Sequence, residues 1–313
     1  MRRFLSFNDF FKIYLSGKSV KLSLDGGFTC PNRDGNLSFE GCLFCSDFGS
    51  GDFTSSKKLS LEDQIKDQKI KLSKKWKAQN YIAYFQNFSN TYGDFFHLKN
   101  LYSYVINRDD IKALSIATRC DCLDDQKIEL LKELSKEKLL WLEIGLQTTK
   151  DESLKLTNRG YSHNKFNEVI EKLDKNKIKY VLHLIYGLPG EDKKDFANTF
   201  TYANSLKPFG IKFHNLYIQK NSPIYAYYLE NPFNLLSMNE YIDLVIESLI
   251  TLNDYTVVHR ITGDPDIKTL YRPRWCGDKL KVVSTIDKIL KEKNIPILKD
   301  EDINKAVSYW KNY

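Results

Sequence analysis

The sequence of 313 residues contains no apolar run of the ~18 residues that a helix needs to cross a membrane. Its first residues, MRRFLSFNDFFKIYL, include acidic and polar positions, so they lack the uninterrupted apolar core of a secretion signal. Internal repeats and low-complexity linkers are absent as well. Six cysteines, three of them expected to act as thiolates, favour a reducing compartment, where disulfides are rare. We therefore expect a cytoplasmic protein with no membrane partner.

The composition is that of a folded protein, with 42% hydrophobic and 13% aromatic residues, which is enough for a substantial core. Lysine and arginine outnumber the acidic residues and give a net charge of +7. Such a charge favours polyanionic partners such as RNA, but a lysine-rich solvated surface explains it equally well. Charge alone does not identify the substrate.

Three cysteines, Cys30, Cys42 and Cys45, lie in one loop after a strand-like run, and no fourth cysteine lies nearby. A structural zinc site commonly has four protein ligands, whereas three thiolates suit an iron–sulfur cubane whose fourth iron stays open to a substrate or cofactor. Phe44 is expected to shield such a cluster from water. The alternative is a zinc-stabilised RNA-binding module without catalysis, in which a histidine completes the site.

Six strand-like runs alternate with helical patterns, which indicates parallel β/α units with right-handed crossovers. The runs are VKLSL (20–24), YIAYFQ (81–86), ALSIAT (113–118), LWLEIGL (140–146), IKYVLHLIYG (178–187) and IKFHNLYI (211–218). Ser60 and Asp124 are predicted to begin two of the helices. Because six units are too few for an eight-stranded barrel, we predict an α/β fold with a partial (β/α)6 barrel.

The pattern changes after about residue 220 and predicts a small α+β C-terminal extension. Its predicted elements are a helix over 238–253, a strand over 257–262 and a helix near 279–293. The chain is thus divided into an N-terminal extension (1–16) that packs on the barrel, the barrel itself (17–220) and a C-terminal accessory domain (221–313).

The run LSLDGGFTCPNRDG, followed by GCLFC, resembles the cluster loop of radical S-adenosylmethionine (SAM) proteins, in the YhcC-like group related to the catalytic subunit of Elongator. Its spacing is longer than the family-wide C-x3-C-x2-C and similar to that of the subgroup. The resemblance implies that Cys30, Cys42 and Cys45 bind a [4Fe-4S] cluster whose unique iron chelates the amino and carboxylate groups of SAM. It also implies the partial-barrel fold, reductive cleavage of SAM to a 5′-deoxyadenosyl radical, and an electron donor such as flavodoxin or ferredoxin.

By the same resemblance, two segments after strands bind SAM. In QNFSNTYGD (86–94), Ser89, Asn90 and Thr91 are candidate contacts of the methionyl amino group, although a polar loop with a helix cap explains them equally well. In LEIGLQTTKDESLKLTNRGY (142–161), Gln147 contacts the cofactor. Arg159 forms a bidentate pair with its carboxylate, a geometry that guanidinium provides and lysine does not.

Further polar residues at strand ends are open to two interpretations. Gly187, in HLIYGLPGE, exposes backbone groups to the adenine by resemblance, or simply belongs to a strand-to-helix turn. Glu143 lies within an apolar run and needs partners, which are either the ribose or substrate, or other protein groups. His183 and His214 are expected to be packed within strands rather than to act as bases.

The segment TRCDC (118–122) resembles the TRPD run of Elongator-like proteins. Arg119 is a candidate partner of a carboxylate or phosphate, and Asp121 either holds this arginine or caps the next helix. Cys120 and Cys122 are not assigned to the cluster, and the role of Cys276 stays open. In the cluster loop, Asp25 is predicted to be structural, and Asn32 and Arg33 to brace the loop.

Two segments are candidates for polyanion contact. The lysines of residues 57–77 alternate with acids, and the pairs Glu62–Lys66 and Asp67–Lys71 are predicted to make this stretch a solvated helix.

The second segment, near the C-terminus, combines cations with stacking faces and is the better RNA-binding candidate. Its residues are Arg260, Arg272 and Arg274 beside Tyr271 and Trp275. With the resemblance to Elongator, it makes tRNA the expected substrate. The resemblance to the YhcC-like group also implies the reaction, which is conversion of a carboxymethylaminomethyl side chain on wobble uridine to aminomethyl; radical chemistry on a small metabolite or a protein is the alternative.

Overall fold

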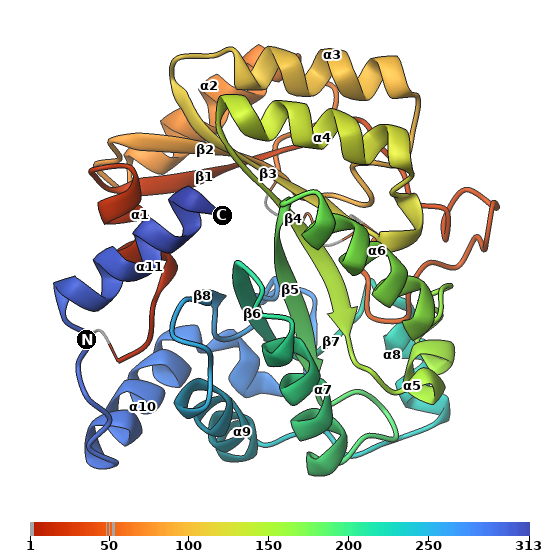
Figure 1. Ribbon diagram of the computed structural model, residues 1–313. Helices are drawn as coiled ribbons and strands as arrows, with labels where there is room; N and C mark the ends of the chain where they lie inside the picture. Colours follow the sequence, from red (N-terminus) through yellow and green to blue (C-terminus); the bar gives the residue numbers. More distant parts are fainter. Residues whose placement is uncertain (1–2, 48, 50, 52–53) are drawn as a thin grey trace.

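A curled, parallel β-sheet forms the centre of the computed structural model, which describes residues 3–47, 49, 51 and 54–313 (Figure 1). Its strand order is β1-β2-β3-β4-β5-β6-β8, and every neighbouring pair is parallel. The strands are β1 Ser19–Leu24, β2 Asn80–Phe85, β3 Ile111–Thr118, β4 Leu139–Gln147, β5 Lys179–Tyr186, β6 Gly210–Asn215 and β8 Val257–Arg260. The predicted α/β partial barrel is confirmed, with seven strands rather than six.

The additional strand comes from the segment that was predicted as a strand of the accessory domain. β8 pairs with β6 and so extends the main sheet. The predicted sixth run is also shorter than expected, because β6 ends at Asn215. The Asn215 side chain accepts hydrogen bonds from Thr262 Oγ1 (3.0 Å) and Gly263 N (2.8 Å) and ties this strand end to the chain after β8. Beyond it, β7 (Ile218–Gln219) pairs antiparallel with β9 (Leu270–Arg272) in a second, small sheet.

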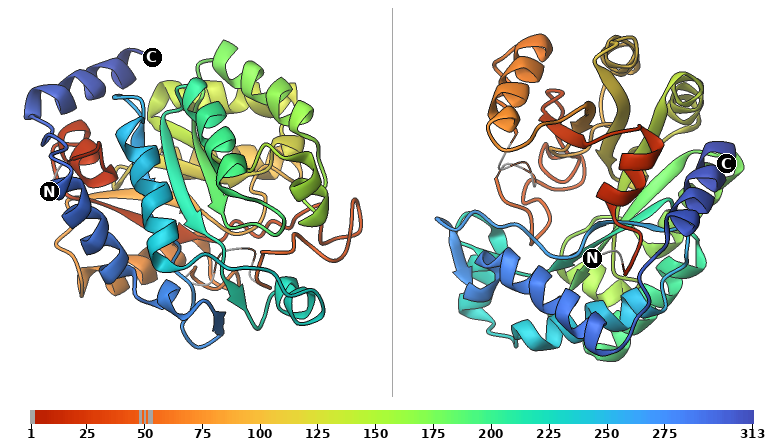
Figure 2. Two further views of the ribbon diagram at one scale, coloured as in Figure 1. Left: turned by 90° about the horizontal axis from the view of Figure 1, so that it is seen from below. Right: turned by 90° about the vertical axis from the view of Figure 1, so that its left-hand side faces the viewer.

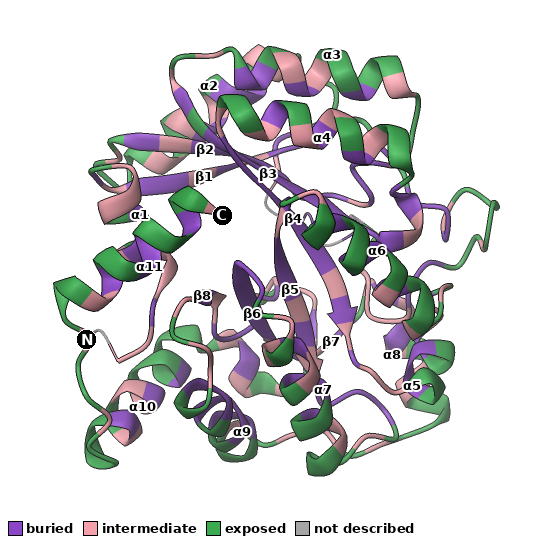
Figure 3. Ribbon diagram, in the orientation of Figure 1, coloured by how far each residue is buried: buried purple, intermediate pink, exposed green. Residues whose placement is uncertain are grey.

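Helices cover the outer face of the sheet (Figures 1 and 2). Those between or beside strands are α2 Leu61–Ser73, α3 Phe95–Ile106, α4 Asp125–Glu137, α6 His163–Lys175, α7 Lys193–Ser205 and α9 Met238–Ile250. The others are α1 Phe7–Tyr14, α5 Asp151–Leu156, α8 Pro223–Glu230, α10 Lys279–Glu292 and α11 Asp300–Asn312, with short 3-10 turns at Cys120–Cys122 and Arg274–Gly277. Figure 3 shows the strands buried and the outward helix faces exposed.

Side-chain caps explain where the covering helices begin. Ser60 and Asp124, predicted as starts, each accept a hydrogen bond from the backbone N–H three residues later. Asp94, Ser162 and Ser237 do the same for α3, α6 and α9. None of the helices in the described part of the chain is both long and apolar enough to span a membrane.

Two terminal helices fill the opening between the edge strands of the sheet. α1 contacts both β1 and β8, and α11 packs against α1 (Figure 2, right). Phe10 and Phe11 of α1 are buried with Trp141, Phe209 and Trp310 in one apolar cluster. The prediction that the first residues pack on the barrel is confirmed. α1 and α11 cover apolar residues that would otherwise be exposed between β1 and β8.

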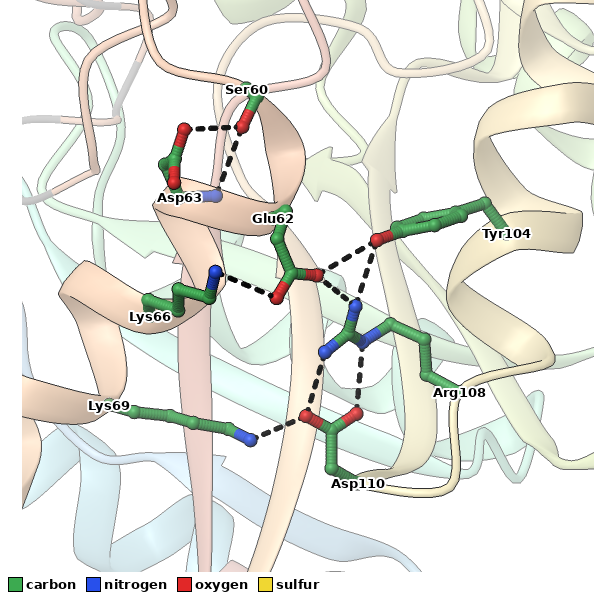
Figure 4. Close-up of polar contacts among 8 residues, drawn as sticks. All are labelled: Ser60, Glu62, Asp63, Lys66, Lys69, Tyr104, Arg108 and Asp110. Carbon is green, nitrogen blue, oxygen red and sulfur yellow. Dashed lines mark hydrogen bonds and ion pairs between the residues drawn. The ribbon is translucent and has the colours of Figure 1, made fainter.

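The lysine-rich helix α2 is held to its neighbours by ion pairs, several of which Figure 4 shows. The predicted pairs are present, with Nζ to oxygen distances of 3.4 Å for Lys66–Glu62 and 2.6 Å for Lys71–Asp67. Arg108 also binds Glu62 and makes two bonds of 2.9 Å to Asp110. Two of the lysines on α2 are thus paired with acids on the exposed surface of the helix, as predicted.

Candidate active site

The cavity that carries most of the predicted site residues opens at the carboxyl ends of the strands, inside the curve of the sheet. Parallel strands present their C-terminal ends at one edge, which is where ligands of such folds bind. Its walls include the last residues of four strands, together with the loop after β1: Thr118, Gln147, Asn215, Arg260, Cys30, Cys42 and Cys45. The three predicted cysteine ligands therefore share one cavity.

The cysteine loop is fixed by hydrogen bonds to the chain that follows β4. Asn32 donates through Nδ2 to the carbonyls of Asn158 (2.5 Å) and Arg159 (3.3 Å). Arg33 donates through Nη2 to the carbonyl of Ser46 at 2.7 Å. The predicted bracing roles of Asn32 and Arg33 are thus confirmed. Asp25 is structural as expected, because its carboxylate accepts from Gly27 N (2.8 Å) and Asn87 Nδ2 (3.2 Å).

Polar groups around Cys42 favour its thiolate. Asn32 Nδ2 lies 3.5 Å and Arg119 Nη1 3.9 Å from its sulfur. A hydrogen bond from the Cys45 thiol, together with these groups and against the effect of burial, lowers the pKa of Cys42 to about 6. Burial raises the pKa of the Cys30 thiol. A thiolate already stabilised by donors is suited to ligate a metal cluster.

The arrangement of these sulfurs bears on which metal group fits. Within the described ranges, no three His, Cys, Asp or Glu side chains are close enough together to hold a single metal ion. A cubane has a different requirement, since each thiolate binds a different iron atom. The cavity that the three cysteines share is compatible with this second arrangement.

Arg159 is buried beside the cysteines and keeps one donor unused. Only 1% of the residue is exposed, and its guanidinium lies 4.0 Å from the centre of the Tyr161 ring. Nη1 donates to the carbonyl of Leu146 (2.8 Å) and Nε to that of Tyr161 (3.3 Å). Nη2 is buried without a hydrogen-bond partner among the described residues, and the residue lines the cavity. A buried, unsatisfied charged donor is costly, so this group fits a carboxylate ligand.

Gln147 ends β4 in an unusual conformation. Its φ is 56°, and the pairing of β4 with β5 shifts register between Gly145 and Gln147. In the orientation that satisfies its hydrogen bonds, the side-chain amide donates to the carbonyls of Gly145 (2.8 Å) and Leu146 (3.1 Å). The bulge leaves Gln147 in the cavity wall, next to Leu146, whose carbonyl accepts the hydrogen bond from Arg159.

The other predicted SAM contacts are divided between cavity and core. Ser89 lines the cavity, and its hydroxyl lies beside the Cys30 thiol. Asn90 instead donates to three backbone carbonyls at 2.8 to 3.2 Å, and Thr91 bonds Thr118 and the carbonyl of Cys122. Gly187, with φ of 95°, is not part of the cavity wall. Of these residues, Ser89 alone has a side chain in the wall.

In the segment after β3, Arg119 and Asp121 bind each other. Asp121 binds Arg119 through two bonds of 2.9 and 2.7 Å, while Asp124 caps α4. Cys120 and Cys122 are buried, and burial raises the pKa of both thiols, that of Cys122 to about 12. Cys276 is also buried, which raises its pKa to about 12, and it accepts a bond from Asn215. These thiols lack the reactivity of a low pKa.

A network of charged side chains lies at the inner end of the cavity. The sequence singles out Glu143 but does not predict its two lysine partners. Glu143 has partners, as required, because it binds Lys21 (2.7 Å), Lys212 (2.6 Å) and His183 (2.7 Å). Arg260 lines the same cavity, which separates it from Arg272 and Arg274, with which it was grouped. The available signal was the presence of lysines within otherwise apolar strands, at Lys21 and Lys212.

Comparison with known proteins decides the family. A sequence profile of the radical SAM superfamily matches residues 30–203, more than half of the chain. The chain belongs to the radical SAM superfamily. A second profile, for the radical SAM C-terminal domain, matches residues 208–292.

Relatives of this radical SAM protein match along most of their length. The chain is 38% identical to the protein YtqA of Bacillus subtilis over 292 residues, covering 93% of this chain and 91% of the relative. It is 30% identical to the protein YhcC of Escherichia coli, with 89% of both chains covered. The resemblance to the YhcC-like group is therefore confirmed.

A solved structure shows the same fold. The archaeal Elp3 of Methanocaldococcus infernus, with an N-terminal deletion, matches with a TM-score of 0.65 at 15% identity. The match covers 89% of this chain and 64% of the Elp3 chain. At this identity the likeness extends to the fold, which is the curled half-barrel of radical SAM enzymes.

Proposed function

We propose that this radical SAM enzyme binds a [4Fe-4S] cluster through Cys30, Cys42 and Cys45, and SAM through Arg159, Gln147 and Ser89. The observation that carries the proposal is the meeting of three thiols and one unpartnered guanidinium nitrogen in a single cavity. When bound, the cluster supplies the electron for reductive cleavage of SAM to a 5′-deoxyadenosyl radical, and a donor such as flavodoxin or ferredoxin restores that electron.

The roles of the protein groups follow from their positions. Cys30, Cys42 and Cys45 would hold the cluster through three irons, and the remaining iron would be free to bind the amino and carboxylate groups of SAM. Arg159 orients that carboxylate through its buried Nη2. Phe44, which also lines the cavity, limits the access of water to the cluster. The protein thus binds, orients and excludes solvent.

Anaerobic reconstitution tests the cluster. The wild-type protein should become brown and bind about four irons and four sulfides per chain. The triple variant Cys30→Ala, Cys42→Ala and Cys45→Ala should lose both the colour and the iron, whereas Cys276→Ala should keep them. Unchanged iron and sulfide in the triple variant would overturn the proposal, and one zinc without sulfide would support the RNA-binding module instead.

For the substrate, we propose tRNA, with conversion of a carboxymethylaminomethyl group on wobble uridine to aminomethyl. The bond between the amine nitrogen and the carboxymethyl carbon would break: the 5′-deoxyadenosyl radical would take one hydrogen atom from that carbon, and loss of one further electron, returned to the cluster, and of a proton would give an imine. Water would then hydrolyse the imine to the aminomethyl group and glyoxylate. The net charge of +7 and a surface groove support this proposal. The groove combines stacking faces, Tyr228, Tyr271 and Trp275, with the exposed cations Arg272 and Arg274. Single-stranded RNA is bound by this combination of aromatic rings and positive charge.

Nucleoside analysis tests the reaction. Cells without the gene should accumulate the carboxymethylaminomethyl nucleoside and lose the aminomethyl product. Identical tRNA nucleosides with and without the gene would contradict the tRNA proposal and favour a small metabolite or a protein as substrate.

The groove has a separate test. The double variant Arg272→Ala and Arg274→Ala should weaken tRNA binding about tenfold and lower its salt dependence by about two phosphate contacts. Lys288→Ala, on the exposed side of α10, is the control for a single surface charge.

A further inference from the structure

The inner end of the cavity contains more positive than negative charge. Lys21, Lys212 and Arg260 enter this region from β1, β6 and β8, and Glu143 from β4 is the carboxylate that they share. Lys212 is only 4% exposed and Glu143 only 2%. Asp264, at the cavity wall, is bound by Lys279 at 3.0 Å. With Lys212 protonated, the inner end therefore has two cations more than anions, without counting its histidines.

Glu143 cannot accept further donors. Its Oε1 receives Lys21 (2.7 Å), Ser115 (3.0 Å) and Trp141 Nε1 (3.1 Å). Its Oε2 receives Lys212 (2.6 Å) and the ring nitrogen of His183 (2.7 Å). A carboxylate offers about four lone-pair positions, so these five donors saturate it.

Two groups of the cavity wall have no hydrogen-bond partner among the described residues. Arg260 makes no hydrogen bond or ion pair with any residue that the structure describes, although it carries five N–H donors. His214 Nε2 is buried and has no hydrogen-bond partner among the described residues. Burial of this surplus charge is unfavourable, and it lowers the pKa of Lys212 to about 7.

We propose that the inner end of the cavity binds a carboxylate of the substrate between Lys212 and Arg260. A planar guanidinium matches a carboxylate through two parallel hydrogen bonds, and a bound anion would offset the excess of positive charge. His214 Nε2 faces the same cavity and, in the tautomer that carries its proton there, supplies a third donor.

This inference rests on the proposed function and makes it more specific. The substituent that would react, carboxymethylaminomethyl, ends in a carboxylate. Anchored on β6 and β8, that carboxylate would hold the substituent in the cavity that the cluster cysteines also line. The product, aminomethyl, lacks the carboxylate, so the same residues would separate substrate from product.

The experiment uses the reconstituted protein with SAM and without reductant, so that binding is measured in the absence of turnover. The probes are two anticodon stem-loop RNAs, one with 5-carboxymethylaminomethyluridine and one with 5-aminomethyluridine at the wobble position. Calorimetry should give at least tenfold tighter binding of the carboxylated RNA. Lys212→Met and Arg260→Met should each remove this preference. Lys179→Met should keep it, because Lys179 begins β5 and is not part of the cavity wall. Retention of the preference in both cavity variants would overturn the inference.

A second probe makes the inference independent of RNA. Carboxyl-labelled acetate, followed by ¹³C NMR line broadening, should bind the wild-type protein in preference to neutral acetamide, and less to Lys212→Met and Arg260→Met. If neither RNA binds while acetate behaves in this way, the inference stands and the tRNA proposal fails. If the gene is required for the modified nucleoside but acetate and acetamide broaden alike, the inference fails and the tRNA proposal stands. Binding of inorganic phosphate in place of acetate would also overturn the carboxylate assignment.

Discussion

Replacement of Glu143 by glutamine should destabilise the fold far more than the loss of a surface charge. The carboxylate is buried and lies within 2.7 Å of both Lys21 and Lys212. Glutamine keeps the shape but removes the charge, and so leaves Lys21 and, below pH 7, the charged form of Lys212 without compensation. Removal of one partner of a buried ion pair costs about 3–5 kcal/mol. With a denaturant slope of about 3 kcal/mol per molar urea, the unfolding midpoint should fall by about 1 M or more.

The loss should depend on pH in a defined direction. In the folded wild-type protein Lys212 has a pKa of about 7, against about 10.4 in the unfolded chain. Its folded-state pKa is depressed, so wild-type stability rises with pH between these two values. Glu143 opposes this depression, and in Glu143→Gln the pKa of Lys212 falls further. The part of the penalty that comes from Lys212 is therefore present below pH 7 and fades as the pH rises through 7, where Lys212 is neutral in both proteins, whereas the part that comes from Lys21 remains.

The assay is urea unfolding of the cluster-free protein at pH 6 and pH 9, followed by circular dichroism. Ser115→Ala is the control, because it removes a neutral donor from the same carboxylate and should cost about 1 kcal/mol at both pH values. A cost for Glu143→Gln below about 1 kcal/mol, or one that is equal at pH 6 and pH 9, would refute the charge network as described.

Three further predictions concern other parts of the molecule. Arg159→Lys should weaken SAM binding by about tenfold to 100-fold, because a charged hydrogen bond is worth about 1.5–3 kcal/mol, and calorimetry with unchanged affinity would exclude the assigned role. Asp110→Asn should lower stability by at most about 1 kcal/mol at pH 7. Its arginine partner holds the pKa of this carboxyl below the usual range, so the difference should decline below about pH 4 in urea titrations. Gly160→Ala places a Cβ 2.6 Å from Asn32 Oδ1 and should reduce the iron bound on reconstitution, whereas Gly190→Ala, with the same sign of φ and open space around it, should not.

The sequence predicts the strands well where an apolar run is bounded by polar residues. The sequence is less informative where one apolar run contains the end of one strand and the start of another. β6 ends at Asn215, whose side chain accepts hydrogen bonds from Thr262 and Gly263, far along the chain. The packing of α1 into the opening of the sheet has the same origin, because its contacts with α11 join the two ends of the described chain.

The site shows the same division between local and distant information. The three cysteines lie within sixteen residues and are evident from the sequence, since their spacing is local. Arg260 was grouped with Arg272 and Arg274 by its neighbourhood in sequence, yet strand β8 carries it into the cavity. The saturation of Glu143 depends on five strands at once, and no single segment contains that information.

The contact between α1 and α11, which lie between the edge strands of the sheet, can form only after α11 has been synthesised. Trp310 of α11 packs on Phe209 and donates its indole N–H to the carbonyl of Tyr255 at 2.6 Å. α1, made early, has to wait for a partner that is synthesised almost three hundred residues later, and such distant contacts form slowly. Until both helices are in place, the apolar residues between β1 and β8 lack the cover that α1 and α11 give them in the folded protein.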